Sequence, residues 1–272
     1  MTLFLIALAA LYLRGWYYFQ RALPQLISGW RVAAFAAGIA SVWISVASPV
    51  AHLDHHLLTA HMVQHLLLMV FAAPLVLLGA PSVVLLHALP RHRSYCVVAQ
   101  FRTSRLVQRL AVICTHPAFC FLAGSLTVIV WHVPAVFELA LHLRFWHVFE
   151  HASFFIAGVL FWWPVIKPWP TIARSSGWSL PLYLFLATLP CDALSAFLTF
   201  CGHVVYRQYL SGGGHFGLSP LDDQALAGAL MWVTVTFAYL IPALVVTTRL
   251  LSSERTSSTG RFLSVFHSGI PD

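Results

Sequence analysis

Residues 61–78 read HMVQHLLLMVFAAPLVLL, an apolar run that contains no Asp, Glu, Lys or Arg. A helix needs about 20 mainly apolar residues to cross the hydrocarbon core of a bilayer, so this stretch predicts a membrane span. Six more apolar stretches flank it in the chain: Leu3–Phe19, Val32–Val50, Pro117–Val130, Trp146–Ile166, Leu180–Phe200 and Gln224–Leu250. The sequence therefore predicts an all-α, polytopic integral membrane protein with seven transmembrane helices.

Two of these stretches are weaker than the others. Arg14 interrupts the first, and the stretch from Pro117 is short unless it extends through Trp131. A further apolar piece, Ser82–Leu89, is too short to span and is expected to be interfacial.

The composition favours the bilayer as the solvent for the chain. Of its 272 residues, 60% are hydrophobic and only 8% are charged, whereas a soluble domain carries about 25% charged residues. The net charge of +7 would also be compatible with binding to nucleic acid. The basic residues, however, lie between the apolar runs, as expected for segments that flank a membrane. We therefore expect lipid and no nucleic acid as a partner.

The distribution of Lys and Arg predicts the orientation. Thirteen of the 15 lie in the segments after the first, third and fifth spans or in the C-terminal tail, and only Arg144 and Arg207 lie on the other side. Basic residues concentrate on the cytoplasmic side of a membrane. We expect the N-terminus outside and the C-terminus inside, with residues 1–250 as one transmembrane domain and 251–272 as a polar, disordered cytoplasmic tail.

This topology sorts the 15 histidines. Four fall on the basic, inner side, and eleven fall at or near the outer face: His52, His55, His56, His61, His65, His132, His142, His147, His151, His203 and His215. Imidazole is the commonest metal ligand in proteins and suits copper, zinc, iron and nickel. The concentration at one face therefore favours a metal site there.

The spacing of four histidines sharpens this hypothesis. His61 and His65 are four residues apart at the start of one span, and His147 and His151 repeat the spacing at the start of another. Residues four apart share one face of a helix. If the two helices face each other, four imidazoles can reach one ion. A lone membrane histidine is usually a hydrogen-bond partner between helices, but two pairs at matching depth favour a site.

Other side chains complete the candidate ligand set. Met69 lies four residues after His65, and its thioether would favour Cu(I). His132 lies at the same membrane face, as do the carboxylates Asp54 and Glu150. Glu150 lies between the two histidines of its helix, so we favour a role in orienting a ring through its second N–H.

Two acidic residues precede the last span. Asp222 is expected to cap that helix together with Ser219, with Pro220 in the first turn, whereas Asp223 remains a candidate ligand. Asp192 is different, because it follows Cys191 in the middle of a span, where an ionisable group is a functional candidate. The five cysteines form no CxxC motif and are interpreted as small apolar residues of a membrane core.

Four blocks of the chain resemble a known family. They are HMVQH from His61 followed by LLLMVFAAPLVLLGAP, WHVPAVFELAL from Trp131, HVFEHASFFIAGVLFWWPV from His147 and DDQALAGALMWV from Asp222. Their sequence and order are similar to the CtaG family of bacterial cytochrome c oxidase assembly factors. The matching positions are His61, His65, Trp131, His132, Pro134, His147, Glu150, His151, Asp223 and Gln224.

The resemblance implies a seven-helix protein of the bacterial plasma membrane that is needed for the maturation of haem-copper oxidase. Copper supply to the oxidase is the implied activity, which makes a haem-copper oxidase subunit the expected partner and a soluble outer copper carrier a second one. On this interpretation copper enters at the outer histidine-rich loops and passes on by ligand exchange, without chemistry on a substrate.

Two other functions fit the same residues, and a membrane scaffold that binds no metal is a third alternative. Three histidines and a carboxylate could hold zinc with an open position for water, as in a membrane metallohydrolase. HVFEH nevertheless has its carboxylate in the wrong register for HExxH. A haem-handling protein would use histidines such as His61 and His151 as axial ligands.

Overall fold

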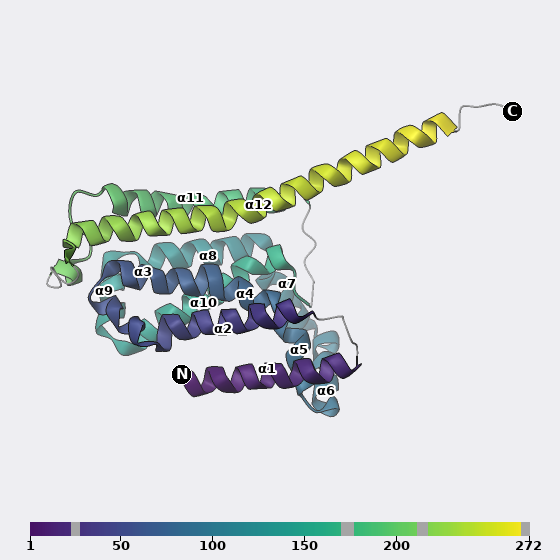
Figure 1. Cartoon of the computed structure of the whole chain (residues 1–272), viewed down its shortest axis with the longest axis horizontal. Helices are drawn as coiled ribbons and strands as arrows, with labels where there is room; N and C mark the ends of the chain where they lie inside the picture. The colour runs from purple at the N-terminus through teal and green to yellow at the C-terminus, as the bar shows by residue number, and fades with distance from the viewer. Residues whose placement is uncertain (23–27, 170–176, 211–216, 268–272) are drawn as a thin grey trace.

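The computed structural model describes residues 1–22, 28–169, 177–210 and 217–267, and every regular element in these ranges is helical (Figure 1). In chain order the elements are α1 (Thr2–Ala22), α2 (Gly29–Ala47), η1 (Pro49–His55), α3 (Leu58–Leu66), η2 (Leu67–Ala72), α4 (Ala73–Leu78), α5 (Pro81–Ala88), α6 (Arg91–Thr103), α7 (Arg105–Cys114), α8 (Pro117–Trp131), α9 (Pro134–His142), α10 (Arg144–Ile166), α11 (Ser179–Phe200), η3 (Arg207–Leu210) and α12 (Pro220–His267).

Six helical segments in the described ranges are long and apolar enough to span a membrane, and counting the α7–α8 pair gives seven. Helices α7 and α8 meet at a bend of 60°. The all-α class is confirmed, and each predicted apolar stretch lies largely within one of these segments. The short fourth stretch does extend through Trp131, where α8 ends.

The stretch that begins at His61 forms one span from Leu58 to Leu78, built from α3, η2 and α4. Its central part, Leu67–Ala72, is a π-helical turn. Pro74 follows this turn, and a proline inside a helix removes one backbone hydrogen bond and crowds the carbonyl four residues earlier. A wider turn just before the proline accommodates that crowding.

Helices α11 and α12 pack side by side along one side of the bundle, and α12 also contacts α3 (Figure 1). Helix α10 packs against α8, α4 and η2, and α2 packs against α4 and η2. On the side away from α12, α1 packs against α5. The π-helical span is therefore enclosed by α2, α10 and α12.

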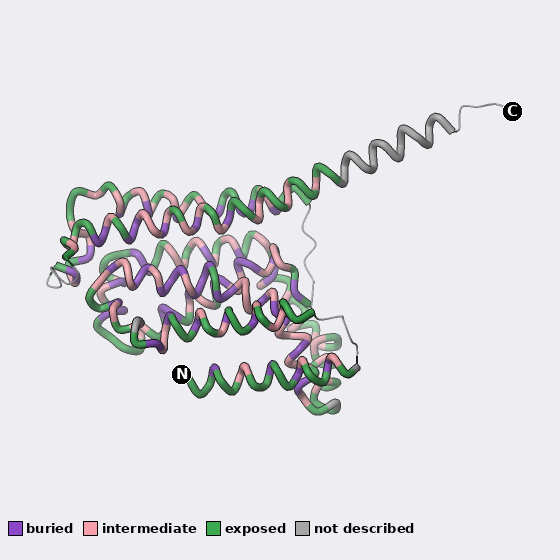
Figure 2. The backbone as a smooth tube through the Cα atoms, in the orientation of Figure 1, coloured by how far each residue is buried: buried purple, intermediate pink, exposed green. Residues whose placement is uncertain are grey.

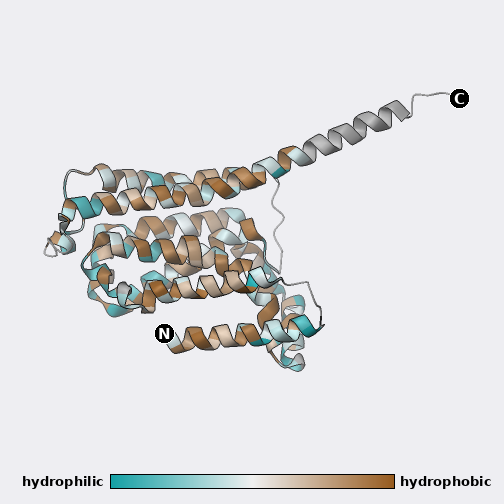
Figure 3. Cartoon of the chain, viewed as in Figure 1, coloured by the Kyte–Doolittle hydropathy of each residue, from teal (hydrophilic) through white to brown (hydrophobic). Residues whose placement is uncertain are grey.

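The surface of the bundle is apolar. Buried residues follow the inward faces of the helices (Figure 2), and hydrophobic residues cover much of the outward faces (Figure 3). Leu126 on α8 and Phe237 and Leu244 on α12 are among many large hydrophobic side chains that are exposed. Such surfaces are unfavourable in water and suit lipid. The chain is a multi-pass membrane protein.

Two segments refine the sequence interpretation. The piece at Ser82–Leu89, expected to be too short to span, lies in the eight-residue helix α5 beside α1 except for Leu89, which follows the helix. Helix α12 continues to His267, whereas the sequence predicts a disordered tail after Leu250. Extending an existing helix adds a hydrogen bond with each residue, and no proline interrupts the chain between Pro242 and Pro271.

The helix ends that carry the histidine pairs lie together. The starts of α3 and α10 and the beginning of α1 point toward one end of the bundle (Figure 1). Helix α6 and the C-terminal end of α12 lie toward the other end. The arrangement of alternating helices is the one that the sequence predicts, while the orientation in the membrane stays a prediction.

Candidate metal centre

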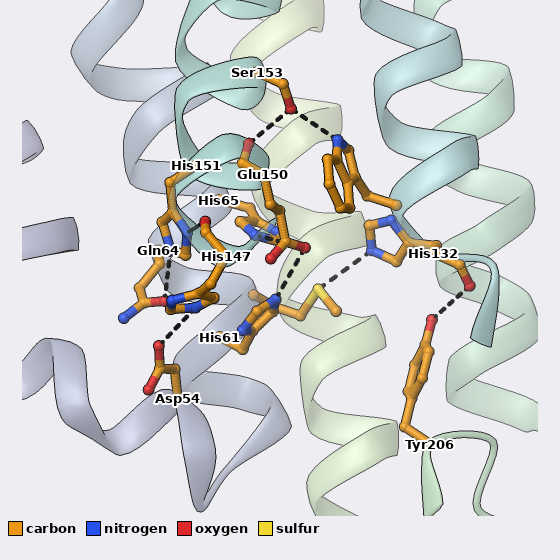
Figure 4. A network of polar contacts seen from close by, with 12 residues as sticks. Asp54, His61, Gln64, His65, His132, His147, Glu150, His151, Ser153 and Tyr206 are labelled. Atoms are coloured by element: carbon orange, nitrogen blue, oxygen red, sulfur yellow. Dashed lines mark hydrogen bonds and ion pairs between the residues drawn. The ribbon is translucent and has the colours of Figure 1, made fainter. Parts of the chain in front are cut away.

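The two histidine pairs face each other across the boundary between α3 and α10 (Figure 4). The ring centroids of His61 and His147 are 6.0 Å apart, and those of His65 and His151 are 5.4 Å apart. Within each helix the paired rings are 4.4 Å apart. The contact between the helices that the sequence hypothesis assumes is therefore present.

The side chains divide into two groups of three. In the first, His61 and His65 from α3 meet Glu150 from α10, and one potential ligand atom from each lies within 4.8 Å of the others. All three side chains are buried, His61 and Glu150 completely. Glu150 thus joins the histidines of the other helix and not those on either side of it in sequence.

The distances within this first group fit metal ligands better than hydrogen bonds. Nε2 of His61 and Nε2 of His65 each lie 3.4 Å from Oε1 of Glu150. A well-formed hydrogen bond spans about 2.7–3.2 Å, whereas a tetrahedral ion with bonds of about 2.1 Å holds its ligand atoms about 3.4 Å apart. Oε2 of Glu150 is buried and has no hydrogen-bond partner among the described residues.

The second group comprises Asp54, His147 and His151. Oδ2 of Asp54 lies 3.1 Å from Nε2 of His147. Nδ1 of His151 lies 2.8 Å from the carbonyl oxygen of His147, and Nε2 lies 3.0 Å from Oε1 of Gln64. Both oxygens only accept, so the neutral ring donates its one N–H to one of them and turns a lone pair toward the other. A histidine whose second N–H is held by a carbonyl is prepared to bind a metal.

Asp54 lies in η1, outside the spans, and its charge is stabilised by its neighbours. Burial acts to raise the pKa of this carboxyl group, but the hydrogen bond with His147 and the nearby His55 and His61 outweigh burial and lower it. The hydroxyl of Tyr209 donates to the backbone carbonyl of Asp54 at 2.7 Å. Asp54 is therefore held in its anionic form, and η3 fixes its backbone.

Asp223 was predicted as a metal ligand, and its contacts give it another role. Its oxygens accept the backbone N–H groups of Leu58 at 2.6 Å and Thr59 at 3.1 Å. The first N–H groups of a helix lack partners within the helix, so this carboxylate from α12 caps α3. Asp223 belongs to neither group of three. It fixes the helix that carries His61.

The prediction that Asp222 and Ser219 cap the last span is confirmed at the start of α12. The Ser219 hydroxyl donates to Oδ2 of Asp222 at 2.5 Å and accepts its backbone N–H at 3.1 Å. These bonds close the first turn of α12, as the capping interpretation predicts.

His132 and Met69 lie beside the two groups and not within them. Nδ1 of His132 donates to the carbonyl of Val128 at 2.7 Å, and Nε2 faces the sulfur of Met62 at 3.4 Å. The rings of His132 and His65 are 6.4 Å apart. Met69 lines a cavity that also reaches His65 and His132. Both predicted residues therefore border the centre.

Several supporting residues escape simple sequence reasoning. Gln64 donates to the carbonyl of Ala51 at 2.7 Å and faces His151, and the Tyr206 hydroxyl donates to the carbonyl of His132 at 3.0 Å. Gln64 lies within the HMVQH motif, which is the signal that could have identified it. Tyr206 comes from a segment with no comparable pattern.

Asp192 and Cys191 stand apart from the two groups. Cys191 is buried and borders the same cavity as Met69. Asp192 is partly exposed, and its Oδ1 atom has no hydrogen-bond partner among the described residues.

The fold and the centre together define a multi-pass helical membrane protein with a buried histidine–carboxylate cluster near one end of its bundle. The model of the cytochrome c oxidase caa3 assembly factor family, Caa3_CtaG, matches residues 10–253. The chain belongs to this family.

Two curated relatives are similar to part of the chain. Uncharacterised proteins of Mycobacterium bovis and Mycobacterium tuberculosis are each 24% identical to this chain over 208 residues. The match covers 74% of this chain and 31% of each relative, so the chain spans about a third of their length. No solved structure matches the chain.

Proposed function

We propose that this assembly factor binds copper between α3 and α10 and delivers it to a subunit of haem-copper oxidase. The observation that carries the proposal is the first group of three, in which two buried imidazoles and a carboxylate from different helices converge at metal-ligand separations. Imidazole ligands suit copper, and the thioether of Met62 next to His132 adds a soft ligand.

The residues of the chain would bind copper and still allow its release. Three protein ligands leave a coordination position open, and an incoming ligand can use such a position. Asp54, His147 and His151 offer three more ligand atoms beside the first group. Copper as cargo would pass by ligand exchange, so no bond of a substrate has to be broken. We place the centre at the outer face of the bacterial plasma membrane, where a soluble copper carrier could reach it.

The space around the centre favours this function over a zinc hydrolase. His61, His65 and Glu150 form a two-histidine, one-glutamate set, which zinc hydrolases also use. The cavity that reaches His65, however, has a volume of about 40 Å³. One water needs roughly 10–15 Å³ of such space, so the cavity admits an ion or a few waters and no lipid substrate.

Metal analysis of the purified protein tests the site. The parent is compared with a first-group variant, His61→Ala with Glu150→Gln, and with a second-group variant, Asp54→Asn with His147→Ala. The exposed histidine His52 supplies the matched control His52→Ala. We expect copper in the parent and the control and its loss in the first-group variant. Equal copper in all four proteins would refute the site.

Oxidase maturation in cells tests the role. Deletion of the gene should lower the amount of active oxidase without lowering its transcript. The His52→Ala variant should restore activity, and the first-group variant should not. Full restoration by the first-group variant would show that the assembly role does not need this centre.

A further inference from the structure

Sulfur atoms gather at one cavity in the interior of the bundle. The chain has four methionines, and three of them, Met62, Met69 and Met231, line the same cavity of about 40 Å³. Their exposed fractions are 1%, 6% and 4%. Cys191, which is 7% exposed, lines it as well. Only Met1 lies elsewhere.

These sulfur ligands come from separate elements. Met62 is on α3, Met69 on η2, Cys191 on α11 and Met231 on α12. His65 and His132 border the cavity on the side of the histidine–carboxylate cluster. The sulfur atoms therefore come from three helical spans, since α3 and η2 belong to one span. The cavity begins at a residue, His65, that also belongs to the first group of three.

The contact between His132 and Met62 has the geometry of two ligands of one cation. The Nδ1 proton of His132 is donated to the carbonyl of Val128, so Nε2 of the neutral ring carries a lone pair. That lone pair faces the sulfur of Met62 at 3.4 Å, and a thioether has no proton to donate. An ion with bonds of roughly 2.0 Å to nitrogen and 2.3 Å to sulfur separates the two atoms by about 3.5 Å.

His65 supplies a second indication. Its side chain is buried, and Nδ1 has no hydrogen-bond partner among the described residues. A buried polar atom without a partner costs free energy unless a ligand satisfies it. This side chain borders both the cluster and the sulfur-lined cavity.

From these observations we propose that the cavity is a second binding site, specific for Cu(I), with Met62, His132, Met231 and Cys191 as its principal ligands. Thioethers and thiols are soft ligands that select Cu(I) over harder divalent ions. The site extends the proposed function, on which it rests for its copper supply. Cu(I) would move between the cluster and the cavity by ligand exchange at His65, with no change of oxidation state.

The alternative is that the methionines only fill space. Methionine is flexible and commonly fills irregular gaps in a core. That role predicts no copper–sulfur bond, and it predicts that replacement by leucine, which is similar in volume, changes neither metal binding nor stability by much. The two interpretations therefore differ in a measurable way.

X-ray absorption of the full-length protein loaded anaerobically with Cu(I) tests the site. The parent should show sulfur bonded directly to copper. The double variant Met62→Leu, Met231→Leu should lose that sulfur signal and bind Cu(I) or Ag(I) at least tenfold more weakly. Cys120→Ser is the matched control, because Cys120 is buried outside the cavity, and it should behave as the parent does.

The outcomes separate this inference from the proposed function. Sulfur-bound copper in the first-group variant His61→Ala, Glu150→Gln would support an independent second site. Copper bound by nitrogen and oxygen alone would overturn the second site and leave the proposed function standing. A parent that binds no copper would overturn both.

A labelled parent protein removes the dependence on correctly folded variants. With selenomethionine at every methionine position, the selenium absorption edge should show copper as a direct neighbour after Cu(I) loading. Selenium without a copper neighbour in the copper-loaded protein would overturn the methionine ligands.

Discussion

Glu150 connects the two histidine pairs, because one of its oxygens lies 3.4 Å from an imidazole nitrogen of both His61 and His65. Sequence reasoning favoured a role in orienting an imidazole ring and did not identify which ring. The side chain crosses to α3, which a one-dimensional pattern does not show. Its complete burial in contact with two imidazoles from another helix makes it the most informative single residue of the centre.

Replacing Glu150 with glutamine should separate metal binding from folding. Glu150→Gln keeps the size of the side chain and removes its charge, so copper affinity should fall by about 10- to 100-fold. The metal-free variant should be at least as stable as the metal-free parent, because burying a charged carboxylate away from water is costly. Competition with a copper chelator and thermal unfolding in detergent measure the two effects. Glu138→Gln on α9 is the control, and a parent-like affinity in Glu150→Gln would contradict the ligand assignment.

Asp223 allows a separate prediction about folding. Asp223→Ala removes both acceptors from the start of α3 and should destabilise the protein by about 0.5–2 kcal/mol. Asp223→Asn keeps one acceptor and should cost less. Copper stoichiometry should stay at the parent value in both folded variants. Loss of copper with unchanged thermal stability would restore Asp223 as a ligand.

At the scale of elements, the helical spacing in the sequence predicts much of the centre. Residues four apart share a helix face, so the pairs His61–His65 and His147–His151 could be identified as units. Each carboxylate lies with histidines of a different element: Glu150 of α10 with the two histidines of α3, and Asp54 of η1 with the two histidines of α10. This pairing depends on how α3, η1 and α10 pack. Met62 was missed for the same reason, because its partner His132 is 70 residues away.

The close approach of α10 to the π-helical turn is a second feature of packing. A Cβ atom added at Gly158 would lie 2.9 Å from the Cα and the carbonyl oxygen of Met69. Those are backbone atoms, which cannot move aside as a side chain does. Gly158 therefore sets the distance between the helices that carry the ligands.

Gly158→Ala should push α10 away from η2. We expect a loss of about 1–3 kcal/mol in stability and weaker copper binding, because the ligands come from both helices. Gly202→Ala is the control, since a Cβ there meets nothing within 4 Å. Thermal unfolding and copper titration measure both effects. Unchanged values for Gly158→Ala would mean that the helices are not held at this spacing.

For the whole molecule, hydropathy and charge were enough to predict the class of fold. Apolar runs with few charged residues indicate spans because a bilayer interior cannot hydrate polar groups, and the helices of the structure follow these runs. The bend between α7 and α8 and the π-helical turn were not predicted, since both depend on local packing around short segments. The orientation in the membrane was inferred from Lys and Arg alone and awaits measurement.

Cysteine labelling can measure that orientation. Cys96 on α6 is exposed among the basic segments, and Cys201 follows α11 at the histidine end of the bundle. In variants that keep one of the two cysteines, a membrane-impermeant maleimide should label Cys201 from the outer side of the membrane. It should label Cys96 only in inverted vesicles, because basic segments face the cytoplasm. The reverse pattern would invert the topology.

The sharing of each ligand group between neighbouring segments has a consequence for the lifetime of the protein. An ion bound to His61, His65 and Glu150 acts as a cross-link between α3 and α10, and a ligand at 100 times its dissociation constant adds about 2.7 kcal/mol to stability. In cells starved of copper, the protein would then be less stable, and membrane proteases would degrade it sooner. The abundance of the assembly factor would follow the supply of its own cargo, without any transcriptional regulator.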